Sequence, residues 1–143
     1  MVNADLLTKH AANFKVTKDN AAEYFKQLFT KHRDIAEHYN AEDIDPDSIL
    51  KSQRYIMMGM SEMQLFLRLP KTVSDERQWR SALSGFKESF GDNSVPMSKF
   101  NKVIDPFLAT MEKYAGGMTA EQKKEWTELL NKAYADMKTW SWY

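Results

Sequence analysis

The chain has 143 residues, long enough for one domain (residues 1–143) with a sizeable buried core. Its 20 basic and 20 acidic side chains balance, so net charge attracts neither nucleic acid nor an anionic membrane as a partner. The chain contains no cysteine, which excludes disulfides, thiolate metal sites and cysteine catalysis and fits a cytoplasmic protein. No apolar stretch approaches the ~20 residues of a membrane span, and the first residues lack the apolar run of a signal peptide.

The composition favours an all-α fold, because glycine is scarce while Ala, Leu, Met, Glu and Lys are common. A first helix is expected over residues 4–14. A second helix follows a group of polar capping residues, and its apolar face carries Phe25 and Phe29. Beyond it, residues 32–39 are expected to form a turn-like segment and residues 40–47 a polar loop.

A long methionine-rich helix is expected over residues 48–69, before Pro70 stops it. This segment is hydrophobic on nearly every side, which is typical of a central rather than a peripheral helix. Gly59 in its interior lowers helix propensity by about 1 kcal/mol. We therefore expect Gly59 to lie in close contact with a crossing helix.

The remaining sequence predicts three more helices. The first runs from Ser74 to about Phe86, and the polar GDNS segment after it is a loop. The second starts near Pro96, and Pro106 either kinks it or displaces its true start. The third opens with the capping-box pattern TAEQ at residues 119–122. With no repeat, linker or low-complexity tract, the whole chain is expected to be a single domain.

The segment LFTKHRDIAEHY resembles the globin signature around the second and third helices. Phe29, His32 and Tyr39 keep the family spacing, although Arg33 replaces the usual proline, and Phe25 matches a bulky pocket position. Further along, KFNKVIDPFLATMEKY and the capping box leading to WTELLNKAYADM resemble the last two helices of invertebrate, nematode-like globins. The resemblance implies an all-α, globin-like fold of about seven to eight helices packed around an apolar pocket.

The resemblance also reveals a missing residue, because globins bind haem iron through a histidine that precedes the last two helices. No histidine follows His38, and the segment LSGFK places Phe86 or Lys87 at the ligand position. Phenylalanine has no lone pair to donate. Lysine ligates only as the free amine, and removing its proton at pH 7 costs about 4.6 kcal/mol.

The residue on the distal side of the pocket, opposite the expected iron ligand, depends on the register of the methionine-rich helix. Gln53 is the best match to the distal residue of the family; a shift of two residues would place Lys51 there and turn Met57 away from the pocket. Met57 is a neutral thioether that can ligate iron, although methionines more often fill irregular core space. His38 is the only histidine near the pocket edge, and His10 is expected to be solvated.

The first interpretation is a degenerate globin-fold protein without histidine-ligated haem. Its apolar pocket is self-filled by its own side chains or takes a small apolar ligand, and the protein is not an enzyme. The predicted pocket residues are Phe25, Tyr39, Gln53, Met57, Phe86 and Lys87.

Two alternatives stay open. One is a haem-binding globin for oxygen storage, transport or sensing, with Lys87, Met57 or His38 as an unusual axial ligand. The other is a helical interaction module that forms a homodimer through the C-terminal aromatic residues of the WSWY segment. No further metal site is predicted, because the acidic loop beginning at Asp43 lacks the glycine and the final glutamate of a calcium loop.

Overall fold

The computed structural model describes residues 2–143, and every regular element in that range is helical. The α-helices are α1 (Ala4–Asn13), α2 (Glu23–Lys31), α3 (Arg33–His38), α4 (Pro46–Ile49), α5 (Gln53–Leu67), α6 (Glu76–Asp92), α7 (Ile104–Tyr114) and α8 (Ala120–Thr139). Two 3₁₀ segments, η1 (Leu69–Lys71) and η2 (Met97–Val103), precede α6 and α7. The predicted all-α, globin-like helix content is confirmed. Within the described range, no helix is long and apolar enough to cross a membrane.

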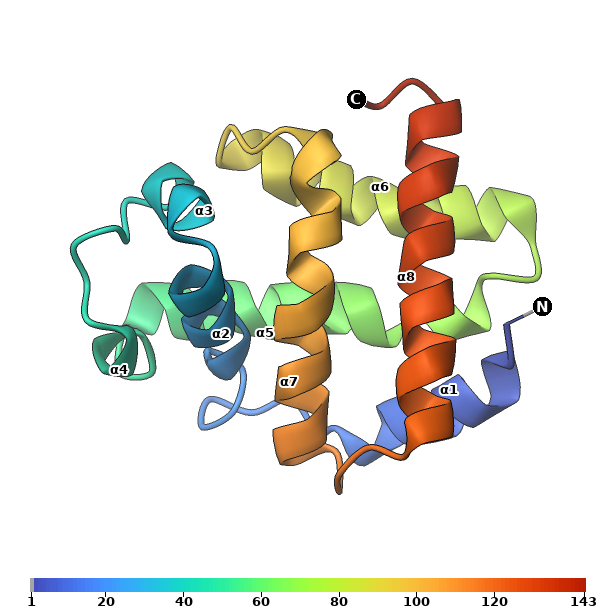
Figure 1. Ribbon diagram of the computed structural model, residues 1–143, viewed down its shortest axis with the longest axis horizontal. Coiled ribbons are helices and arrows are strands. Elements are labelled where there is room, and N and C mark those ends of the chain that lie inside the picture. The colour runs from blue at the N-terminus through green and yellow to red at the C-terminus, as the bar shows by residue number, and fades with distance from the viewer. Residues whose placement is uncertain (1) are drawn as a thin grey trace.

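The helices form crossed layers (Figure 1). α5 and α6 follow the long axis of the molecule, while α7 and α8 stand side by side across them. α1 lies along the lower edge, and α2, α3 and α4 gather at one end. The contacts between elements agree with this view, since α5 touches both α2 and α6, and α8 touches both α1 and α7. This arrangement places the core between α2, α5, α6 and α7.

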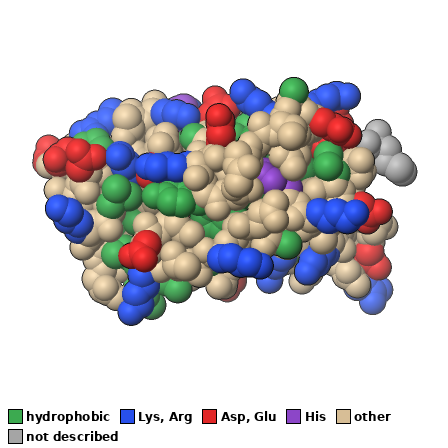
Figure 2. All heavy atoms as spheres, turned by 90° about the horizontal axis from the view of Figure 1, so that it is seen from below, with side chains coloured by type: hydrophobic (Ala, Val, Ile, Leu, Met, Phe, Trp, Pro, Cys, Tyr) green, Lys and Arg blue, Asp and Glu red, His purple; other side chains and the backbone are tan. Residues whose placement is uncertain are grey.

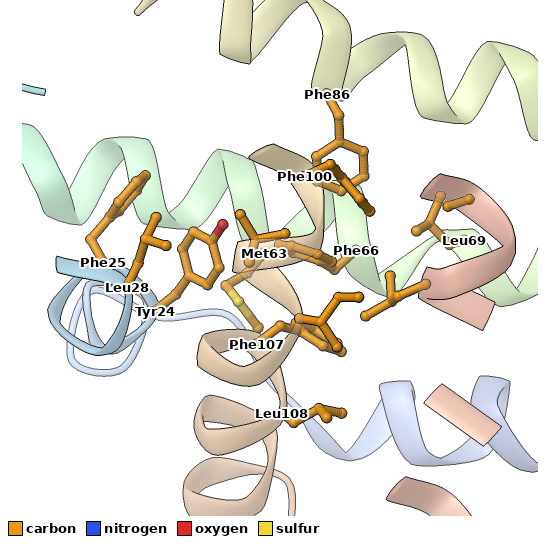
Figure 3. Close-up of a cluster of buried hydrophobic side chains, with 14 of the residues drawn as sticks. Tyr24, Phe25, Leu28, Met63, Phe66, Leu69, Phe86, Phe100, Phe107 and Leu108 are labelled. Atoms are coloured by element: carbon orange, nitrogen blue, oxygen red, sulfur yellow. The ribbon is translucent and has the colours of Figure 1, made fainter. Parts of the chain in front are cut away.

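The core is mainly aromatic (Figure 3). Phe66 stacks on Phe107 at a centroid distance of 4.4 Å, and Phe107 meets Trp126 edge-on at 4.9 Å. Such ring pairs add about 0.5–1.5 kcal/mol beyond the burial of their area. Residues with 0% exposure in the core include Leu7, Phe25, Met63, Phe66, Leu83, Phe86, Phe100, Phe107 and Trp126.

The surface carries charges of both signs. Seen from below, Lys and Arg side chains alternate with Asp and Glu side chains around a smaller apolar area (Figure 2). This face has no extended patch of one sign, as expected from the balanced composition.

Gly59 allows α5 to cross close to the turn that precedes α2. A Cβ atom on this residue would lie 2.3 Å from the carbonyl oxygen of Ala21, a distance that real Cβ atoms essentially never show. The close contact predicted for Gly59 is therefore found, although its partner is the turn that leads into α2 and not a helix. Only glycine fits there without displacing backbone.

Two boundaries in the middle of the chain differ from the sequence-based expectation. The helix predicted over residues 48–69 is divided: Pro46 begins the short α4, and α5 starts only at Gln53. The division arises at Ser52, whose extended backbone (φ −83°, ψ 118°) does not continue a helix. In addition, the segment expected to be turn-like over residues 32–39 forms α3.

The boundaries in the C-terminal half follow local chemistry. α6 continues well beyond Phe86, because Phe90 keeps the apolar face of the helix buried. Pro106 lies in the first turn of α7, where its missing N–H costs little, so it displaces the helix start instead of kinking the helix. The predicted capping box of α8 is confirmed: Gln122 N donates to Thr119 Oγ1 at 3.0 Å, and Thr119 N donates to Gln122 Oε1 at 2.8 Å.

Candidate functional site

The contact between α5 and α6 lies where the sequence predicted a ligand pocket. The two helices run in opposite directions (Figure 1), and their facing side chains touch at successive levels. At one level, the Ser89 hydroxyl donates a hydrogen bond to Glu62 Oε1. One helical turn further along, the rings of Phe66 and Phe86 lie 4.8 Å apart. Figure 3 shows these two rings between the helices, next to Phe100 and Phe107.

Gly85 brings the backbone of α6 close to α5 at the next level. A Cβ atom on this residue would lie 2.6 Å from Leu65 Cδ2 and 3.2 Å from Arg68 Nη2. The same guanidinium donates to the carbonyl oxygen of Ala82 at 3.3 Å. The side chains of Leu65 and Arg68 therefore lie directly against the backbone of α6 at this level.

A second group of rings fills the interior beside the first turns of α5. The Tyr55 hydroxyl donates to the Tyr39 carbonyl oxygen at 2.7 Å, and both side chains are buried. The Tyr39 ring lies 5.3 Å from those of Phe25 and Phe29, and the Phe29 and Tyr55 rings lie 5.6 Å apart. Because each ring contacts its neighbours, this end of the interior is also filled by the chain itself.

Of the six predicted pocket residues, three lie in the interior. Phe25 and Tyr39 meet in the ring cluster beside α5, and Phe86 lies in the α5–α6 contact. Gln53 is exposed, and 52% of the Met57 surface is accessible, so these two side chains do not line the interior. The inward face of α5 instead carries Tyr55, Gly59, Glu62, Met63 and Phe66.

Lys87, the sixth predicted pocket residue, is exposed and held on the outside of α6. Its ammonium lies 5.0 Å from the centroid of the Trp142 ring, and Arg80 lies 5.1 Å from that of Trp140. These cation–π contacts hold the C-terminal tail, residues 140–143, against α6. Lys87 therefore points toward the tail and not toward Phe86 in the core.

The histidines lie in different parts of the molecule. His38 is half-buried at the last residue of α3. The prediction that His10 is solvated is wrong, because His10 is only 2% exposed. Trp126 Nε1 donates to His10 Nδ1 at 2.9 Å, and His10 Nε2 lies 3.0 Å from the Gly117 carbonyl oxygen. Its partners are more than 100 residues away in the sequence, so no local pattern indicated them.

These positions do not fit a haem. The two helices expected on either side of it are in direct side-chain contact through Phe66 and Phe86. The donor atoms of Lys87, Met57 and His38 come from α6, α5 and α3, and the first two side chains are exposed. We therefore derive no chemistry from an iron centre.

Glu62 is the interior residue that sequence reasoning missed. Its side chain lies on the inward face of α5 and is only 4% exposed. Burial raises the pKa of its carboxyl group to about 7, and the hydrogen bond from Ser89 only partly offsets this effect. Burial and the nearby Glu62 charge also raise the pKa values of Tyr24 and Tyr39. The available signal was an acidic residue between Gly59 and Phe66, in the middle of the apolar face.

A hollow of about 350 Å³ opens outward from Glu62 between α5 and α6. Met58 and Leu65 form its apolar wall on α5, while Glu88 and Asp92 line it from α6. No basic side chain belongs to the lining within residues 2–143. The hollow is therefore acidic, and its floor is a buried carboxyl group.

The course of the chain matches solved structures of a globin-like protein. The high-resolution structure of the C. elegans globin-like protein GLB-1 superposes with a TM-score of 0.82 at 18% sequence identity, covering 95% of this chain and 89% of that chain. The fold is a globin fold. A low-resolution structure of GLB-1 in a P3121 crystal form gives a TM-score of 0.81 with the same identity and coverage. No protein-family model matches the sequence, and no curated protein does. At 18% identity, the likeness establishes the globin fold alone.

Proposed function

We propose that this chain is a non-catalytic globin-fold protein that holds no histidine-ligated haem and whose interior is filled by its own side chains. In this proposal, the protein acts by binding another molecule and does not transform a substrate. The observation that carries it is the contact between Phe66 and Phe86, on the two helices between which the family resemblance would place a haem.

The donor chemistry supports the same proposal. Phe86, at one of the two positions that match the ligand position, has no lone pair, and Lys87, at the other, lies against Trp142 outside the core. To reach the interior, the Lys87 ammonium would have to leave the Trp142 ring, and a lysine side chain ligates iron only as the free amine. The other two candidate ligands need no loss of a proton, but Met57 is half-exposed and His38 lies on α3.

Hemin titration tests the proposal directly. We expect no stoichiometric complex with the intense visible band of specifically ligated haem, while a histidine-ligated globin treated in parallel shows one. A red 1:1 complex that resists exchange would contradict the proposal. In that case, Lys87→Ala, His38→Ala and Met57→Leu would identify the ligand by loss of the band.

The Lys87→His variant tests whether an imidazole at position 87 is enough to give haem binding. This variant leaves the Phe66–Phe86 contact intact. We expect hemin still not to bind stoichiometrically, because position 87 faces the C-terminal tail and the ring contact would also have to break. If Lys87→His binds hemin tightly, only the ligand was missing, and the argument from a filled interior fails.

An interaction module that dimerises through its C-terminus is the second candidate. Tyr143 is 37% exposed, although its ring stacks on Tyr134 at 5.0 Å within the chain. Light scattering over a range of concentrations tests this candidate. A dimer lost in Tyr143→Ser would favour it, and a constant monomer mass would exclude it.

A further inference from the structure

Glu62 joins α5 to α6 through a single polar contact. Its carboxyl group accepts the Ser89 hydroxyl hydrogen on Oε1, and no other hydrogen bond to it forms within residues 2–143. The side chain lies at the floor of the hollow between the two helices, almost completely removed from solvent. Burying the neutral carboxylic acid here costs far less desolvation free energy than burying the carboxylate, which would need a counter-charge.

The surroundings provide no such counter-charge. From α6, the ionisable groups lining the hollow are Glu88 and Asp92, both acidic. From α2 and the residue after α3, the nearby groups are the phenols of Tyr24 and Tyr39. From α5 itself, the hollow receives only uncharged neighbours of Glu62. Every ionisable group facing Glu62 therefore disfavours its negative charge or leaves it unbalanced.

The aromatic part of the core lies directly behind this contact. Phe66 is four residues after Glu62 on α5, and Phe86 is three residues before Ser89 on α6, so the ring pair is the next level of the same helix contact. Separating the helices at Glu62 and Ser89 would therefore loosen the adjacent Phe66–Phe86 level of the contact.

We propose that the α5–α6 contact is a pH-dependent closure: protonated Glu62 holds the two helices together, and ionised Glu62 lets them separate, so that small apolar molecules reach Phe66 and Phe86. The inference rests on the proposed function, because it assumes an interior filled by side chains and not by haem. It adds to that function the pH range in which the Phe66–Phe86 region becomes accessible to small apolar molecules.

The direction of the pH effect follows from proton binding. In the closed form, the pKa of Glu62 is raised to about 7, whereas in an open, solvated form it returns toward 4.5. The closed form therefore binds the proton more tightly, and raising the pH from 4.5 through 7 shifts the equilibrium toward the open form. The ratio of open to closed molecules rises by up to ~300-fold over this interval.

A neutral apolar dye, Nile red, measures the opening without being repelled by the acidic hollow. With the full chain, we expect the dye fluorescence to rise between pH 6 and 8 while far-UV circular dichroism keeps its helical signal. Glu62→Gln, which cannot ionise, should give low fluorescence at every pH. Glu112→Gln on the exposed side of α7 should behave as the unmodified chain.

The inference would be overturned by the absence of a pH response in the unmodified chain, by an equal response in Glu62→Gln, or by a rise that coincides with loss of helix. The double variant Glu88→Gln with Asp92→Asn should keep the transition. If that double variant abolishes it, the outer carboxylates and not Glu62 sense the pH.

Hydrogen exchange provides a measurement that does not depend on any variant. After correction for the intrinsic rate, amides of α5 and α6 should exchange faster at pH 8 than at pH 6, and those of α8 should not. Hemin titration keeps the two proposals distinct. Tight hemin binding together with a Glu62-dependent dye response would contradict the proposed function but support the pH effect. No hemin binding together with a dye response that does not depend on Glu62 would support the proposed function and contradict the pH effect.

Discussion

Glu23 and Glu62 are both buried glutamates that join two helices, but they are paired differently. Glu23 on α2 lies 2.9 Å from the Lys113 ammonium on α7 and accepts a second hydrogen bond from Gln27 at 2.7 Å. Within the described part of the chain, the hydrogen-bond partner of Glu62 on α5 is the neutral Ser89 hydroxyl of α6. In the α2–α7 contact, the Lys113 ammonium thus balances the Glu23 carboxylate. In the α5–α6 contact, Ser89 is neutral and cannot balance a negative charge on Glu62. The comparison shows that the partner of a buried carboxyl group, and not its burial alone, decides whether the group stabilises or destabilises a helix contact.

The largest expected effect comes from Glu62→Gln. The amide keeps the shape and accepts the Ser89 hydrogen bond but carries no charge. At pH 8 the variant should gain up to ~3 kcal/mol in free energy of unfolding, because the raised pKa of Glu62 costs the natural chain stability above pH 4.5. Below pH 4.5 the two proteins should be nearly equal. Urea denaturation at pH 4 and pH 8 measures this, and a gain of equal size at both pH values would refute the charge argument.

Removal of the ammonium from the other pair should act in the opposite direction. Lys113→Met leaves the Glu23 carboxylate buried, with Gln27 as its one remaining donor among residues 2–143. We expect a loss of about 2 kcal/mol, below the usual cost of breaking a buried pair because the Lys113 side chain is 52% exposed. Urea denaturation at pH 7 measures the loss. An unchanged midpoint would mean that Glu23 does not depend on Lys113.

The smallest expected effect is that of Glu23→Gln. This variant weakens the interaction with Lys113 but leaves no buried charge without a partner, so the loss should be about 1 kcal/mol. It serves as the matched counterpart of Glu62→Gln: the same substitution at two buried positions should destabilise one contact and stabilise the other at pH 8. Stabilisation by both substitutions would show that burial outweighs pairing at Glu23 as well.

The sequence predicted the fold where the signal was local or carried by spacing. The capping box at Thr119 and Gln122, the close contact at Gly59 and a helix disturbed at Pro106 were all predicted. At Pro106 the structure shows which of the two expected outcomes holds, a displaced start. The break at Ser52 was missed, because the continuous apolar pattern on both sides outweighed a single serine as a helix-ending signal.

The candidate site could be predicted only in part. Phe25, Tyr39 and Phe86 were placed by family spacing and are buried. Gln53 and Met57 depended on the register of a helix that looked apolar on every side, so the pattern could not distinguish its inward face. Glu62 escaped notice for the same reason, since its burial depends on α6, which contacts it from 27 residues further along the chain.

The ring pair Phe66–Phe86 also bears on how the protein is made. Where a prosthetic group completes a core, newly synthesised chains must wait for it, and their survival follows its supply. Under the proposed function, aromatic side chains complete the core at this point, so folding of the polypeptide needs no prosthetic group. The proposal then predicts a cellular abundance that is independent of iron availability.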